Sequence, residues 1–228
     1  MGEYDGKSAD AVPVRVWDRP TRLFHWALVA CLAGSWITGD QGMMDWHERF
    51  GLTALALVVF RLVWGVVGGE FARFSSFVRG PAAVLRYIRE TASGRHPEHA
   101  GHNPLGALSV LALLLLVATQ ATLGLFASDD ILYEGPLYHL AGYDLSSTLT
   151  GWHHQVFDIL LIVVIVHVVA VFAYMIFLRD DLILPMVTGV KRMAREDAPA
   201  RIRRTPCWVA AIVFVLTAAA AYAISLLG

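Results

Sequence analysis

Two histidines, His153 and His167, lie in one apolar stretch of the chain, WHHQVFDILLIVVIVHVVAVFAYMIF. An α-helix turns ~100° and rises ~1.5 Å per residue, so the step from 153 to 167 ends ~40° short of four turns and ~21 Å along the axis. The two imidazoles therefore share one helix face. Histidines in membrane hydrocarbon are costly and are functional by default. This spacing suits a helix that holds two stacked haems; the alternative is two histidines that hydrogen-bond to neighbouring helices.

Two further histidines supply a second imidazole at each of these levels. His25 lies near the start of the first apolar run, and His47 lies at the start of the second. On antiparallel helices His47 can face His153 at one level, and His25 can face His167 at the other. Two imidazoles on opposite sides of haem iron leave no open position, so such iron transfers electrons. Zinc is a weaker alternative because neither level offers a third or fourth ligand.

Arg61 and His154 are the other polar residues on these helices. Arg61 follows His47 by the same ~21 Å helical step, so it is expected on the same face beside the inner haem. There its guanidinium can pair with a haem propionate, or it can snorkel to the headgroups instead. His154 points ~100° away from His153 and nearly opposite to His167, which favours His153 as the ligand.

A third group of histidines, His96, His99 and His102, occupies the segment RHPEHAGHNP. Its prolines and glycine make a regular helix improbable, so solvated loop histidines are expected there rather than a metal site. His102 is nearest to the next apolar run and could approach a quinone or a propionate. His139 is expected to be a loop histidine.

The composition indicates a membrane protein. The chain is 57% hydrophobic with a mean hydropathy of +0.56, and neither value is typical of a soluble domain. Apolar runs at 23–39, 50–68, 105–127, 154–178 and 207–227 each approach the ~20 residues that a membrane-spanning helix requires. The sequence therefore predicts an all-α integral membrane protein with five transmembrane helices.

The basic residues predict the orientation of these helices. Sixteen of the 18 lysines and arginines fall in segments 1–22, 69–104 and 179–205, which alternate with segments that hold only Arg49. Positive charge marks the cytoplasmic side, so the N-terminus is expected inside and the C-terminus in the periplasm of a bacterial inner membrane. The segment GPAAVLRYIRETASG, on the basic side, has the pattern of a short helix on the lipid surface.

The segment 128–152 is expected to be a long external loop. It holds Asp129, Asp130, Glu134 and Asp144 and has no lysine or arginine. A negative patch on the outer face suits a basic soluble partner. The alternative is a solvated loop that merely lacks positive charge. Nucleic acid is not expected as a partner.

At these residues the sequence resembles the bacterial cytochrome b561 and nickel-hydrogenase b-type cytochrome family. The resemblance implies a four-helix bundle with two b haems over 23–180, bound axially by His25, His47, His153 and His167, and electron flow between a periplasmic partner and quinone. The chain departs from the minimal members by a fifth, peripheral helix in 206–228, which follows a cytoplasmic linker at 181–205. The motifs that carry the resemblance are Arg22-x-x-His25-Trp26, His47-x3-Gly51 with Arg61, Gly101-His102-Asn103-Pro104, and Trp152-His153 with His167.

Three functions compete at this stage. The first is an electron-transfer subunit that links a periplasmic hydrogenase, c-type cytochrome or other dehydrogenase to membrane quinone. Its quinone is expected near the inner haem, beside Arg22, Arg61 and His102. The second is a quinone-coupled superoxide oxidase, which an acidic outer face disfavours because superoxide is an anion. The third is a histidine-lined metal transporter.

Overall fold

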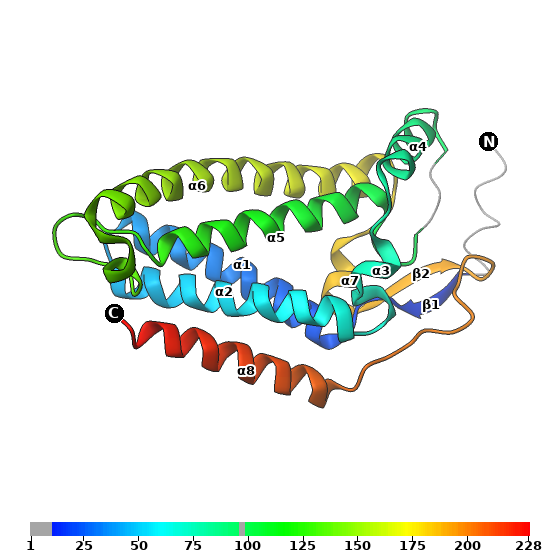
Figure 1. The fold of residues 1–228 in the computed structure, drawn as a ribbon. Helices are drawn as coiled ribbons and strands as arrows, with labels where there is room; N and C mark the ends of the chain where they lie inside the picture. Colours follow the sequence, from blue (N-terminus) through cyan, green and yellow to red (C-terminus); the bar gives the residue numbers. More distant parts are fainter. Residues whose placement is uncertain (1–10, 96–98) are drawn as a thin grey trace.

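The long helices run side by side as a bundle, and short elements cap one end (Figure 1). The computed structural model describes residues 11–95 and 99–228, so residues 1–10 and His96 lie outside the described part. The long helices are α1 (Arg19–Asp40), α2 (Met44–Val67), α5 (Pro104–Gly124), α6 (Tyr138–Phe177) and α8 (Cys207–Ser225). The capping elements are β1 (Ala11–Arg15), η1 (Glu70–Ala72), α3 (Phe74–Phe77), α4 (Pro81–Ala92), α7 (Ile183–Thr188) and β2 (Val190–Ala194).

Side-chain caps fix where two of the long helices begin. The Asp18 carboxylate accepts a 2.8 Å hydrogen bond from the backbone N–H of Thr21 at the start of α1. The Asn103 side chain does the same for Gly106 of α5, at 2.7 Å. Each cap satisfies an N–H that has no partner within the helix. Both helices also carry a proline in the first turn, where its missing N–H costs nothing.

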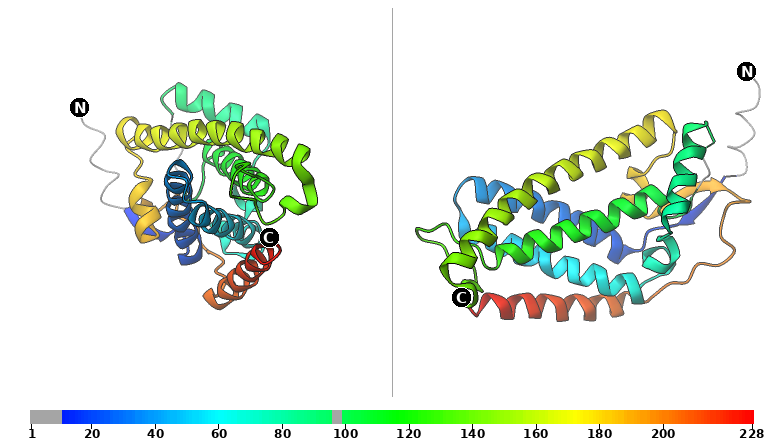
Figure 2. Two further views of the ribbon diagram at one scale, coloured as in Figure 1. Left: turned by 90° about the vertical axis from the view of Figure 1, so that its left-hand side faces the viewer. Right: turned by 45° about the horizontal axis from the view of Figure 1, so that its top comes forward.

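Four helices, α2, α5, α6 and α8, are long and apolar enough to cross a membrane. They correspond to four of the five predicted runs. α1 is not among them, because it carries Arg19, Arg22, His25 and Asp40 and is less apolar than the others. The fifth predicted span is therefore not shown by length and composition, although α1 runs along the bundle beside α2 (Figures 1 and 2).

The segment 128–152 is not the long loop that the sequence predicted. α6 begins at Tyr138 and continues to Phe177, with a kink at Gly142, where φ is +70° and only glycine is unstrained. The non-helical connection after α5 is therefore residues 125–137, shorter than predicted, and Asp144 lies on α6. The sequence argument failed here because Gly142 and the polar residues around it conceal a helix that extends beyond the apolar run.

The predicted surface helix is α4, which begins with Pro81 in its first turn. Its Tyr87 is buried against the bundle, whereas Leu85 and Ile88 are exposed beside Arg89. This arrangement leaves an apolar strip next to positive charge, as expected for a helix that lies against lipid headgroups.

Packing between the long helices is uneven. α1 packs on α2, α2 on α5, and α5 on α6, with Trp64, Val58 and Val117 fully buried between them. α6 makes little or no close backbone contact with α1 or α2. α8 packs mainly on α2, on the opposite side of the bundle from α6 (Figure 2), so it is peripheral, as the sequence predicted.

A two-stranded antiparallel sheet, which the sequence analysis missed, joins distant parts of the chain. β1 precedes α1 and β2 follows α6, and Val14 lies opposite Lys191 in the register. Val14, Val16, Trp17 and Met193 form a small second core beneath it. The two segments therefore meet at the same end of the bundle, beside α3 and α7 (Figure 1).

Asp18 offers a test of how α1 is anchored. Its second carboxylate oxygen accepts a 3.1 Å hydrogen bond from the indole N–H of Trp64 on α2. Asp18→Ala removes this bond and the helix cap, so the free energy of unfolding is expected to fall by about 1–3 kcal/mol. The fall is measured as a lower Tm in detergent micelles. Asp18→Asn keeps an oxygen acceptor and should lose less, and Asp40→Ala, at the exposed end of α1, serves as the control.

Candidate functional site

His47 on α2 and His153 on α6 face each other across the side of the bundle where these helices do not pack closely. Their ring centroids are 6.0 Å apart and the rings are nearly perpendicular. An imidazole nitrogen binds a transition metal at about 2 Å and its ring centre lies about 1 Å further back, so two axial imidazoles place their centres about 6 Å apart. The observed spacing therefore fits one metal between the two rings.

Backbone carbonyls fix which nitrogen of each ring carries the proton. His47 Nδ1 lies 2.8 Å from the carbonyl oxygen of Ser35, and His153 Nδ1 lies 3.0 Å from that of Gln120. A carbonyl only accepts, so each Nδ1 donates and each Nε2 keeps its lone pair. The Gln120 side-chain amide lies 3.1 Å from His153 Nε2, where it donates to that lone pair. Such anchoring of the second nitrogen is typical of metal-binding histidines.

Glycines on neighbouring helices make room for both rings. A Cβ at Gly39 would lie 2.8 Å from His47 Nδ1, and a Cβ at Gly124 would lie 3.0 Å from His153 Cε1. Any larger residue would displace the imidazole it touches. The sequence analysis missed these two positions, because the sequence does not show which side chain packs against a glycine in a helix.

Four charged or titratable residues lie at the other end of the bundle: His25, Arg61, His102 and His167. Burial, and then the nearby positive charges of Arg61, His167 and His25, lower the pKa of His102 to about 3. The structure thus brings these predicted residues within electrostatic reach of one another, from α2, α6, α1 and the segment before α5. His167 Nδ1 also lies 3.3 Å from the Ser109 hydroxyl.

Several buried polar atoms at this end have no hydrogen-bond partner among the described residues. They are His25 Nδ1, Arg61 Nη1 and His102 Nδ1. An unsatisfied buried group costs about 1–3 kcal/mol, so native proteins rarely leave several together. The atoms suit a bound group that carries anionic oxygens.

Arg61 does not snorkel toward water, which was the alternative left open by its sequence. Only 2% of it is exposed, and its guanidinium stacks 4.8 Å from the Phe74 ring. Asp18 is the carboxylate that interacts with it electrostatically. A buried guanidinium with one unpaired nitrogen is a suitable anchor for a carboxylate or a phosphate.

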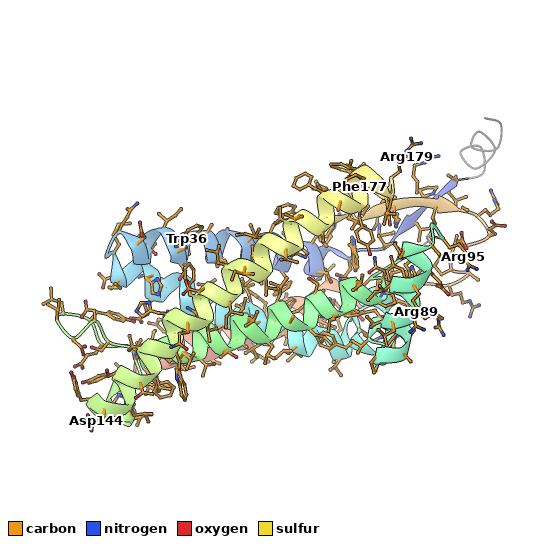
Figure 3. All side chains as sticks on the ribbon, turned by 90° about the horizontal axis from the view of Figure 1, so that it is seen from above. Trp36, Arg89, Arg95, Asp144, Phe177 and Arg179 are labelled. Atoms are coloured by element: carbon orange, nitrogen blue, oxygen red, sulfur yellow. The ribbon has the colours of Figure 1, made fainter. Side chains whose placement is uncertain are left out.

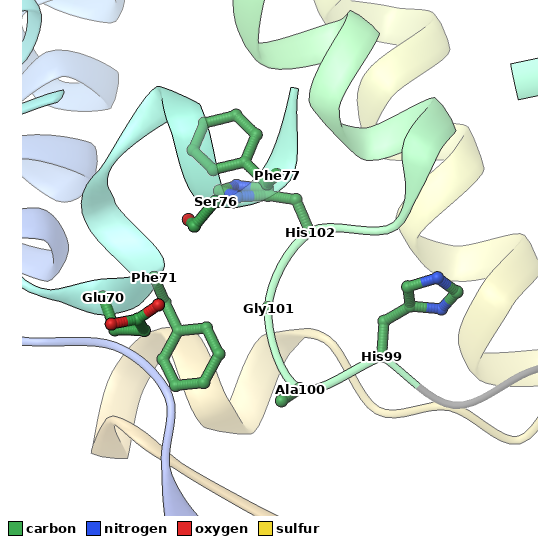
Figure 4. Close-up of a pocket in the computed structure, with 8 residues that line it drawn as sticks. All are labelled: Glu70, Phe71, Ser76, Phe77, His99, Ala100, Gly101 and His102. Atoms are coloured by element: carbon green, nitrogen blue, oxygen red, sulfur yellow. The ribbon is translucent and has the colours of Figure 1, made fainter. Parts of the chain in front are cut away.

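A cavity of about 220 Å³ opens beside this inner group (Figure 4). The His102 ring packs between Trp17 and Phe77, with centroids at 4.6 and 4.5 Å. His99 and His102 are both partly buried, so the expectation of solvated loop histidines was wrong for them. Their burial depends on the small second core, which the sequence did not predict. The lining residues are Glu70, Phe71, Ser76, Phe77, His99, Ala100, Gly101 and His102.

Arg22, His154 and His139 lie apart from these groups. Arg22 donates through Nη1 to the carbonyl of Val187 at the end of α7 and lines a different cavity of about 290 Å³, beside Arg19 and Trp26. His154 is exposed, in agreement with the choice of His153. His139 is also exposed, but it lies on α6 and not in a loop.

The acidic end of the molecule is an ordered turn. The Asp129 carboxylate accepts hydrogen bonds from the backbone N–H groups of Ile131, Leu132 and Tyr133 at 2.8–2.9 Å. The Tyr133 bond contributes most to holding the pKa of Asp129 below its usual value. Tyr133 also donates to Glu48 at 3.2 Å, which ties the turn to α2. The turn therefore presents fixed negative charge near the outer histidine pair.

Among the described residues, no three histidine, cysteine, aspartate or glutamate side chains are grouped closely enough to hold a metal ion. The His47–His153 pair brings two imidazoles together, fewer protein ligands than a zinc site has. Two facing imidazoles suit a metal ion whose other ligands come from a cofactor.

A model of the prokaryotic cytochrome b561 family matches residues 16–189, which include His25, His47, His153 and His167 and exclude α8. The chain is similar to a probable Ni/Fe-hydrogenase B-type cytochrome subunit of Azotobacter vinelandii, with 24% identity over 233 residues that cover 87% of this chain and 96% of that protein. No solved structure gives a significant match.

Gly39, which makes room for the His47 ring, allows a test of the outer pair. Gly39→Ala should push the His47 ring away from the Ser35 carbonyl, because its Cβ would lie 2.8 Å from Nδ1. Loss of such a supporting contact typically weakens metal binding about 10- to 100-fold. We expect less haem at the outer position, measured as haem bound per protein. Gly151→Ala on α6, where a Cβ meets nothing within 4 Å and which lies on nearly the opposite helix face from His153, should bind haem as the unaltered protein does.

Proposed function

Since the chain belongs to the prokaryotic cytochrome b561 family of multi-pass membrane proteins with b haems, we propose that it passes electrons through two b haems between an outer redox partner and membrane quinone. The observation that carries this proposal is the His47–His153 pair, whose spacing and anchored Nδ1 atoms suit one iron between them. Haem iron held by two imidazoles exchanges single electrons and has no free position for O2.

His25 and His167 hold the inner haem in this proposal. They come from α1 and α6, two helices that do not pack closely, and they lie within electrostatic reach of Arg61 and His102. The unpaired nitrogen of Arg61 would bind a propionate there, which removes the cost of leaving it unsatisfied. With iron at both levels, His153 and His167 define a path of ~21 Å along α6.

The proposed orientation places the N-terminus in the cytoplasm and the C-terminus in the periplasm, with α1 as a fifth crossing. The 22 residues of α1 extend ~33 Å, enough for the ~30 Å hydrocarbon core. The basic residues Arg89, Arg95 and Arg179 lie at one end of the bundle and Asp144 lies at the other (Figure 3). This distribution supports the orientation through the positive-inside rule.

Quinone is proposed to bind at the inner end, in the cavity beside His102. That cavity combines the aromatic rings of Phe71 and Phe77 with polar groups, as a quinone ring with two carbonyl oxygens requires. His102 lines this cavity and lies within electrostatic reach of Arg61, His25 and His167. Arg22 is tied to α7 and is less well placed for this role than the sequence suggested.

The outer partner is proposed to be a hydrogenase or another periplasmic redox protein. The similar Azotobacter vinelandii protein is named as a hydrogenase cytochrome subunit, which favours a hydrogenase. The acidic turn at Asp129 and the start of α6 form the docking surface in this proposal. Superoxide oxidation is less well supported, because Arg49 is the only basic residue of the outer segments and fixed negative charge repels an anion.

Histidine variants test the assignment of ligands. The purified protein is expected to bind two non-covalent b haems with low-spin spectra. His47→Ala and His153→Ala should each remove the outer haem and spare the inner one, because one imidazole cannot hold six-coordinate iron. His25→Ala and His167→Ala should do the reverse. Redox titration of the visible spectrum separates the two haems; if His47→Ala and His167→Ala silence the same haem, the pairing is wrong.

Charge variants test the docking surface. We expect Asp130→Asn, Glu134→Gln and Asp144→Asn together to slow association with the native partner more than dissociation, because exposed charges act mainly on encounter. Asp129 is left intact since it holds the turn. The reaction should also slow as salt rises, over a Debye length of ~8 Å at physiological ionic strength. Glu196→Gln, near the inner end, is the control; equal rates for the triple variant at low salt would place docking elsewhere.

A further inference from the structure

A row of polar side chains below the inner cavity has no role in the electron path described above. Its members come from four different parts of the chain that meet at the inner end of the bundle. Tyr87 lies on α4, Tyr174 lies on α6, and Lys191 lies on β2. Asp180 follows α6, and His99 precedes α5.

These side chains are joined by short contacts. The Tyr87 and Tyr174 hydroxyls are 3.1 Å apart, and the His99 ring packs edge-on against Tyr87 with centroids at 5.4 Å. Lys191 Nζ lies 2.7 Å from the Asp180 carboxylate and donates to the His99 carbonyl at 3.3 Å. The Asp180 charge also acts on Tyr87. The five residues therefore form one network, held together by a hydroxyl pair, ring packing, an ion pair and the charge of Asp180.

The network runs from the inner surface into the protein. The Lys191 and Asp180 side chains keep 11% and 14% of their area exposed, so water reaches this end. Tyr87 is only 2% exposed. His99 belongs to the network and also lines the inner cavity, on the same connecting segment as His102 (Figure 4). His99 therefore connects the network to the inner cavity.

We propose that Asp180, Tyr174, Tyr87 and His99 carry protons between the inner aqueous face and the quinone cavity. This proposal rests on the function proposed above. Reduction of a quinone to a quinol takes two electrons and two protons; the haem path supplies electrons one at a time and no protons. His99 lines this cavity, so the network offers protons a route to a bound quinone along polar side chains.

The chemistry of the residues suits this transfer. Burial, and then the neighbouring Tyr174 hydroxyl, raise the pKa of Tyr87, so its hydroxyl stays protonated. A hydroxyl passes a proton by accepting one while it donates another, and an imidazole does so through its two nitrogens. Asp180 takes up the proton at the surface, beside Lys191. The groups that face this path are Lys191 from β2, and Glu70 and His102 from the cavity wall.

Tyr87→Phe tests the proposal, because it removes the hydroxyl and keeps the buried ring. The full protein with both haems is placed in phospholipid vesicles, reduced with dithionite, and mixed with duroquinone while haem oxidation is followed. Loss of a relaying group should slow this oxidation at least about tenfold, increasingly so as pH rises, with a larger solvent deuterium isotope effect. Haem spectra and the duroquinone concentration for half-maximal rate should not change. Tyr222→Phe, on the exposed surface of α8, is the matched control.

Asp180→Asn, at the surface end, provides a second and independent variant. It retains an oxygen for Lys191 and should show the same dependence on pH and deuterium. Wild-type rates and isotope effects in both variants would overturn the proton path while leaving the quinone assignment intact. A slow rate without any pH or isotope dependence would also overturn it, in favour of a structural clamp. If the unaltered protein holds both haems and does not reduce duroquinone, the quinone assignment itself fails.

Discussion

The separation of α6 from α1 and α2 determines where the four histidines lie. α6 packs closely on α5, and the rest of the bundle meets it through side chains such as the His47–His153 pair and the Trp36–Phe157 pair, with ring centroids at 5.9 Å. Packed helices normally approach to 8–10 Å, which leaves no room for a macrocycle between them. A bundle that holds α6 by one neighbour leaves the opposite face open to a flat group. Haems bound at this face, as proposed, would form part of the packing of the bundle.

The two ends of this open face are prepared differently. At the outer end, carbonyls of Ser35 and Gln120 bind each Nδ1, so the rings are oriented by the protein itself. At the inner end, His25, Arg61 and His102 leave polar nitrogens without partners among the described residues. Asp18 provides one negative charge near Arg61, and the Arg61 nitrogen without a partner among the described residues suits an anionic group. The inner end is therefore the part of the bundle whose stability depends most on what it binds.

The sequence predicted those features that follow from regular periodicity. The positions of His153 and His167 on one helix face, the beginning of α4 at Pro81 and the peripheral place of α8 all follow from helical spacing and local composition. Other features depend on contacts between distant segments. The roles of Gly39 and Gly124 could not be recognised, because each depends on an imidazole from a neighbouring helix that packs against the glycine. His99 and His102 were taken as solvated because the β1–β2 sheet and its core, which bury them, join residues far apart in the sequence. The start of α6 was missed because the chain changes direction at a single glycine.

The β1–β2 sheet also has a consequence for biosynthesis. β1 leaves the ribosome before α1, whereas β2 follows α6. At about 5–20 residues per second the second strand emerges roughly 10–35 s after the first. The sheet therefore forms only once α1, α2, α5 and α6 have all been synthesised, and only if both strands have stayed on the same side of the membrane. A helix inserted in the wrong direction would put the two strands on opposite sides of the membrane. β1 would then lack its partner strand and keep an exposed edge. Pairing of β1 with β2 therefore indicates that the helices between them have inserted in the correct direction.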